Sequence, residues 1–283
     1  MQLLLALAPG DAADLVTEDP AMREALLEHW GLNKPLLERW VDFLVNAAQG
    51  DLGASLTYRP GQPVTDLVLG AAGRSAGLLI GAIVSVTALG VGLAYSSTAA
   101  RRPVQLLSVA PAFLLAAGAV AWLNELAWGA MEAGYIPRPG WFALPLQDHP
   151  LKTALAVGVL AIGSSSLTEV HAAAAEELRS IRLSGYVEAA RARGAALWPH
   201  VLTNLLPPLT SVIASRTAFL LGGLVVVEKV LAINGAGAML WQACRMRDLP
   251  LAMGITLVAA AVVASARLAG DLLRLALDPR LAR

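Results

Sequence analysis

The sequence is poor in cysteine and in charge. It has one cysteine, Cys244, in 283 residues, which excludes an internal disulfide framework and a cysteine-based metal cluster. Charged residues make up 15% of the chain, whereas ordinary soluble domains carry about 25%. The formal net charge is zero, so nothing electrostatic favours nucleic acid as a partner. The histidines show no metal-ligand spacing, and no metal site is expected: His29, His149, His171 and His200.

Catalytic motifs are also missing. The sequence has no GxxxxGK[ST] loop, so any ATP used by this protein must be bound by a partner. It has no HExxH motif, and no paired carboxylates or Ser/His arrangement within its apolar segments. We therefore predict no catalytic residue and no cofactor bound by this chain.

Apolar residues dominate what is present. They make up 57% of the sequence, and the mean hydropathy is +0.61. The charges are clustered, which leaves charge-free stretches long enough to cross a bilayer, a task that takes about 20 apolar residues. The prediction is an all-α, multi-pass membrane bundle of five spans, at about 75–95, 104–124, 151–170, 208–227 and 249–266.

The segments between the spans indicate a topology. Arg101 and Arg102 are predicted in a short loop between the first two spans, which the positive-inside rule places in the cytoplasm. The hydrophilic stretch 171–207 and the carboxyl tail are predicted on the same side, with 125–150 outside. Residues 1–67 are predicted as an extracytoplasmic segment, with helical periodicity over 21–47, and 68–283 as the transmembrane domain.

One motif lies in the hydrophilic stretch, where residues 188–207 read EAARARGAALWPHVLTNLLP. Glu188-Ala189-Ala190, Gly194 four residues later and the closing Leu206-Pro207 resemble the EAA loop. That loop is the signature of membrane subunits of binding-protein-dependent ABC importers. We expect a short helix that docks into a groove on an ATPase subunit, and its apolar contacts with that partner are expected from Tyr186, Val187, Ala190, Ala195 and Leu197. Gly194 is expected to end it, and Pro207 and Pro208 to bend the chain back into the membrane.

The resemblance narrows to the dipeptide and oligopeptide permease branch. Motifs similar to those of the branch run collinearly along the chain: APGD at 8–11, GDLGAS at 50–55, GYIP at 134–137, GGLVVVE at 222–228 and LDPR at 277–280. Only the last few residues of the family's first helix are present. This leaves five spans instead of six, through a wrong start site or a genuinely short chain.

The resemblance implies an assembly in a bacterial inner membrane. A homologous permease subunit, expected as a heterodimer partner, would complete the pathway through the lipid bilayer. Two ABC ATPase subunits, which use ATP and Mg²⁺, would dock on the EAA loops, and an extracytoplasmic solute-binding protein would deliver substrate. Peptides are the expected substrate, with nickel chelates, glutathione and sugars as alternatives.

Arg216 is a charged residue inside the fourth predicted span. An intramembrane charge costs several kcal/mol unless it is paired or faces water, so Arg216 is a candidate for lining the pathway. A snorkelling cation or a contact with a partner subunit are the alternatives. Two other classes also stay open, an ATPase-independent secondary transporter and a degenerate, inactive permease.

Overall fold

The computed structural model describes residues 12–134 and 150–277, and in these ranges the chain is helical. Eleven α-helices and one 3-10 helix, η1 (Ala13–Leu15), are joined by loops with a single isolated β-bridge, Ala54 to Pro63. The predicted all-α class is confirmed. The motif residues 8–11, 135–137 and 278–280 lie outside the described residues.

The five predicted spans correspond to long apolar helices. Four helices in the described ranges are long and apolar enough to cross a membrane: α4 (Val64–Tyr95), α6 (Ala112–Glu132), α10 (Trp198–Val230) and α12 (Leu249–Leu277). A fifth span results if α7 (Pro150–Gly163) and α8 (Ser166–Arg182), which meet at a 61° bend, count as one. This agrees with the predicted number.

The second span begins later than predicted. Residues 98–108 form a separate helix, α5 (Thr98–Ser108), and the span α6 starts only at Ala112, after Pro111. The loop predicted for Arg101 and Arg102 was therefore wrong. The Arg101 guanidinium donates hydrogen bonds to the carbonyl oxygens of Ala94 and Ser96 at the end of α4, at 2.6–3.1 Å. It thus satisfies carbonyls that a helix end leaves without partners.

The fourth span also differs from its prediction. Helix α10 runs unbroken through Pro207 and Pro208, so these residues do not bend the chain back before the span. Proline removes a helical hydrogen bond and disfavours the helix interior in water. Membrane helices tolerate it because neighbouring groups satisfy the released backbone atoms.

The described residues belong to two compact units. The first unit comprises Met1–Ala76 and Asn234–Ala260, and the second comprises Gly77–Ile233 and Ala261–Arg283. This division follows packing, whereas the sequence-based boundary at residue 67 follows segment order and stays a prediction.

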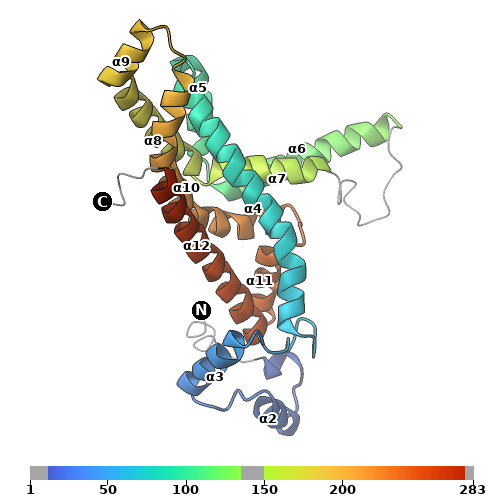
Figure 1. The fold of residues 1–283 in the computed structure, drawn as a ribbon. Coiled ribbons are helices and arrows are strands. Elements are labelled where there is room, and N and C mark those ends of the chain that lie inside the picture. The colour runs from blue at the N-terminus through green and yellow to red at the C-terminus, as the bar shows by residue number, and fades with distance from the viewer. Residues whose placement is uncertain (1–11, 135–149, 278–283) are drawn as a thin grey trace. The chain divides into compact units, whose positions relative to one another are not determined.

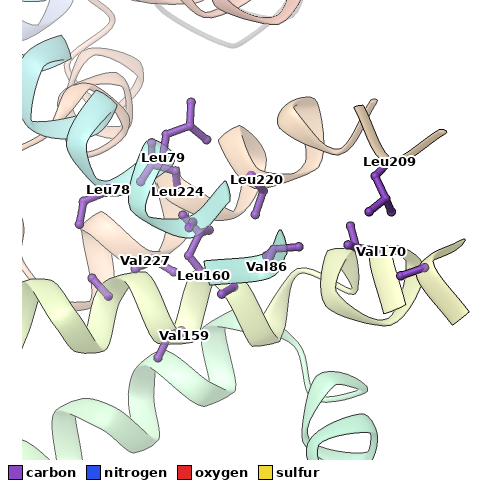
Figure 2. Close-up of a cluster of buried hydrophobic side chains, with 14 of the residues drawn as sticks. Leu78, Leu79, Val86, Val159, Leu160, Val170, Leu209, Leu220, Leu224 and Val227 are labelled. Atoms are coloured by element: carbon purple, nitrogen blue, oxygen red, sulfur yellow. The ribbon is translucent and has the colours of Figure 1, made fainter. Parts of the chain in front are cut away.

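The core of the second unit is made mainly by α4, α6, α7, α8 and α10. Figure 2 shows Leu160 of α7 beside Val227 and Leu224 of α10, with Val86 of α4 nearby. Small residues allow this close approach, since a Cβ atom at Gly223 would lie 3.0 Å from the Leu160 side chain. Helix α10 packs against α6, α7 and α8, so it is the central element of this unit.

The first unit contains short helices and a loop that is bound to a buried carboxylate. The periodic stretch 21–47 forms α2 (Pro20–His29) and α3 (Leu36–Ala48), and a loop over 50–63 follows. Asp248, 0% exposed, lies before α12 and accepts hydrogen bonds at 3.0–3.1 Å from the backbone N–H groups of Leu56, Thr57 and Tyr58. It also accepts one from the Ser55 hydroxyl at 2.5 Å. The loop is thereby tied to the chain segment that follows α11 (Ala236–Arg245).

Candidate functional site

The EAA segment forms a short helix between two long ones. Helix α9 (Gly185–Ala192) follows α8 after only two residues, and α10 begins at Trp198. Figure 1 shows α9 and α5 at the same end of the second unit. There Tyr95 and Trp198 place their ring centroids 6.2 Å apart, and the Arg182 guanidinium lies 5.7 Å from the Tyr95 ring. The basic segments predicted on one side of the membrane therefore lie together.

Gly194 ends α9 in the predicted way. It has φ +67°, the left-handed conformation that glycine adopts without steric cost. Its N–H donates to the Arg191 carbonyl at 3.0 Å, and the Ala195 N–H donates to the Ala190 carbonyl at 3.0 Å. This pair of bonds is a Schellman motif. A Cβ atom at Gly194 would meet no atom of the described residues within 4 Å, so within this part of the chain it is the backbone conformation that favours glycine.

Helix α9 has one buried and one exposed face. Val187 and Ala190 are 2% and 1% exposed and pack inside the chain, so the expectation that they supply apolar surface for a partner was wrong. The reason is helical spacing: residues three apart share a face, and this face is used to attach α9 to its own subunit. Tyr186, Glu188 and Ala189 are exposed and form the outer face.

The closing Leu206-Pro207 pair lies on α10. Leu206 is 39% exposed and Pro207 is buried. Pro207 and Tyr186, 21 positions apart in sequence, line the same cavity of about 500 Å³, together with residues of α8 and the end of α12. The structure thus brings the first turn of α9 close to the closing proline of the motif, and Arg216 does not line this cavity.

Arg216 is paired inside the span. Its two terminal nitrogens contact the two carboxylate oxygens of Glu169 on α8, at 2.6 and 2.5 Å, which is a bidentate ion pair. Its guanidinium carbon lies 4.6 Å from the ring centroid of Phe219. The Arg216 side chain is 18% exposed and that of Glu169 46%. The cost of an isolated charge in a membrane is therefore reduced within this chain.

Comparison with known proteins identifies the family. Residues 77–283 match the family described as "Binding-protein-dependent transport system inner membrane component". This chain belongs to that family. It is 25% identical over 293 residues to the oligopeptide transport system permease protein AppB of Bacillus subtilis, covering 99% of this chain and 92% of that protein.

Two further relatives are also permease proteins of transport systems. A candidate peptide permease protein of Brucella ovis is 31% identical over 302 residues, with 99% and 92% of the two chains covered. The glutathione transport system permease protein GsiC of Pectobacterium atrosepticum is 28% identical over 296 residues, with 98% and 90% covered. The chain is thus an inner-membrane permease component, not the ATPase, and the secondary-transporter alternative is set aside.

Sequence reasoning missed two residues of this permease that the structure makes prominent. Glu169 was not recognised as the partner of Arg216, although it is the one acidic residue in the predicted span 151–170. Asp248 was not singled out, and the loop residues that donate hydrogen bonds to it lie about 190 positions earlier. A rule that pairs opposite charges found within predicted spans would have found Glu169, whereas nothing local marks Asp248.

Proposed function

We propose that this permease is one half of an ATP-driven peptide importer, and that α9 is the helix on which an ATPase subunit docks. The observation that carries the proposal is the geometry of α9: an exposed face of Tyr186, Glu188 and Ala189, a buried face, and a fixed end at Gly194. An exposed short helix held rigidly by its own subunit suits a groove on a partner.

Coupling follows from how α9 is joined to the bundle. Two residues separate α8 from α9, and five residues separate α9 from α10. Val187 and Ala190 anchor α9 through their burial, so a push on α9 acts on both neighbouring helices. Because both belong to membrane spans, motion of the ATPase dimer would reach the interior of the bundle. We infer alternating access driven in this way, with ATP and Mg²⁺ bound by the ATPase subunits.

The substrate and partners are drawn from the relatives. Those compared are named for oligopeptide, peptide and glutathione transport, and these compounds share peptide bonds and charged termini. The proposed partners are a homologous permease subunit, two ATPase subunits and a solute-binding protein. A test of transport therefore needs these partners together with the permease.

Uptake into proteoliposomes tests the proposal. The complete transporter would be reconstituted with its binding protein, and uptake of labelled trialanine, a nickel chelate and a disaccharide compared with and without ATP. We expect ATP-dependent uptake of the peptide alone. ATP-independent uptake would overturn the coupling mechanism, and uptake of the chelate or the disaccharide instead of trialanine would overturn the substrate.

A further inference from the structure

The Arg216–Glu169 pair lies at the middle of two spans. Arg216 is central in the apolar stretch Val201–Val230 of α10. Glu169 lies in the first turn of α8, close to the middle of the bent pair Pro150–Gly163 and Ser166–Arg182 if these helices count as one span. A charge facing lipid at that depth is strongly disfavoured, and such residues face the bundle interior or a water-filled path. The pair therefore points to the pathway side of these helices.

The span that carries Glu169 is interrupted beside it. Gly163 approaches α6 so closely that a Cβ atom there would lie 2.7 Å from the Ala112 Cα. Ser165 has φ +56°, an uncommon conformation for a residue other than glycine. The buried Ser164 hydroxyl has no hydrogen-bond partner within the described ranges. Broken helices with unsatisfied polar groups near the midplane are where transporters of other kinds bind substrate.

The two charges are not equally accessible. Arg216 is 18% exposed, its face is covered by Phe219 and its Nε atom is buried. Glu169 is 46% exposed, and each of its carboxylate oxygens contacts one terminal nitrogen of Arg216. A carboxylate offers about four acceptor directions, so the outer ones remain for a ligand. The accessible edge of this neutral pair is negative, and its ligand is a cation that donates hydrogen bonds.

We propose that the Glu169 carboxylate is a substrate subsite in the translocation path that takes an ammonium group of the imported peptide, with Arg216 as the residue that positions it. The inference rests on the proposed function. Glu169 and Arg216 sit on the helices α8 and α10 that flank α9, so motion of α9 that shifts one helix against the other would change their separation. Such motion would open or close the subsite during the transport cycle.

The test compares peptides with and without an ammonium group. Trialanine, N-acetyl-trialanine and N-acetyl-Ala-Lys-Ala would be offered at subsaturating concentration to the full reconstituted transporter with one binding protein throughout. The key variant, Glu169→Gln with Arg216→Gln, removes both charges and leaves neither unpaired. Glu176→Gln, an exposed acid on the same helix α8, is the matched control.

The double variant is expected to import trialanine about tenfold more slowly, the effect of losing a charge-assisted hydrogen bond. N-acetyl-trialanine should change less than about twofold. If the import rate falls for trialanine alone, the subsite binds the terminal ammonium of the peptide. If it falls equally for N-acetyl-Ala-Lys-Ala, the subsite also binds the ammonium of a lysine side chain. Equal rates of wild type and double variant on all three peptides would overturn the subsite.

A charge swap separates recognition from structure. Glu169→Arg with Arg216→Glu keeps an ion pair but exposes a cation. If the pair only holds α8 to α10, the swapped transporter recovers import of trialanine and the subsite is refuted. If Glu169 binds ammonium, import stays low while assembly and basal ATP hydrolysis are normal. A wild-type transporter that imports none of the peptides would overturn the peptide function itself, and the subsite with it.

Discussion

Replacing Asp248 by alanine should release the loop 55–58 of the first unit. The carboxylate is fully buried and accepts hydrogen bonds from the N–H groups of Leu56, Thr57 and Tyr58, and from the Ser55 hydroxyl. Its other oxygen accepts from the Leu251 N–H at 3.2 Å, at the start of α12. Alanine would leave these donors without their acceptor, so the loop should open more often.

The magnitude follows from the type of bond lost. Hydrogen bonds to a charged acceptor contribute about 1.5–3 kcal/mol each, and they are not additive when one acceptor serves several donors. A combined loss on the order of 3 kcal/mol corresponds to a factor of more than about 100 in the local opening equilibrium. Asp248→Asn keeps one acceptor oxygen and should cost roughly half as much.

Hydrogen exchange measures this opening directly. Exchange of the amides of residues 56–58 would be followed by mass spectrometry on the purified complex. Exchange depends on local opening, so Asp248→Ala should accelerate it by about 100-fold. Asp51→Asn is the control, since this exposed acid in the same loop accepts one bond, from the Gly53 N–H at 2.8 Å. Unchanged protection of residues 56–58 in Asp248→Ala would refute the reasoning.

Two further predictions concern the thermal stability of the permease and the reactivity of its cysteine. Ala232 follows α10 with φ +51°, a conformation that costs a residue with a Cβ about 1–2 kcal/mol. Ala232→Gly should therefore raise the unfolding temperature of the permease in detergent. Ala261→Gly is the control, since a glycine inside α12 should lower this temperature. A lower temperature for Ala232→Gly would contradict this. Burial raises the pKa of the Cys244 thiol. Because the thiolate is the form that reacts with maleimide, Cys244 should be labelled more slowly than free cysteine at pH 7.5, and its labelling rate should increase with pH. Labelling as fast as free cysteine at pH 7.5 would show that the thiol is not shielded.

The features that sequence could predict depend on local pattern. The five spans follow from apolar runs, and the end of α9 follows from Gly194, because few other residues adopt positive φ readily. Span boundaries were less accurate where the apolar signal was continuous. Residues 103–124 carry no charge, so nothing in hydropathy separated α5 from α6.

The features that sequence could not predict depend on contacts between distant segments. Arg101 was interpreted from its charge alone, whereas its hydrogen bonds to Ala94 and Ser96 decide its position. Which face of α9 is exposed depends on what it packs against, so the burial of Val187 could not be read from the motif. The ion pair of Glu169 with Arg216 joins residues 47 positions apart and required the packing of α8 on α10.

Co-purification with the ATPase tests the central claim most directly. The tagged permease would be expressed with its partner permease and ATPase subunits and isolated in mild detergent, as wild type, Gly194→Glu and Gly134→Glu. Gly134 also follows a helix and has φ +77°, and no atom of the described residues lies within 4 Å of a Cβ position there. Its substitution therefore carries a similar backbone cost away from α9. We predict that wild type and Gly134→Glu retain the ATPase and that Gly194→Glu loses it while still inserting into the membrane. Retention of the ATPase by Gly194→Glu, or its loss from both variants alike, would contradict the assignment of α9 as the docking helix.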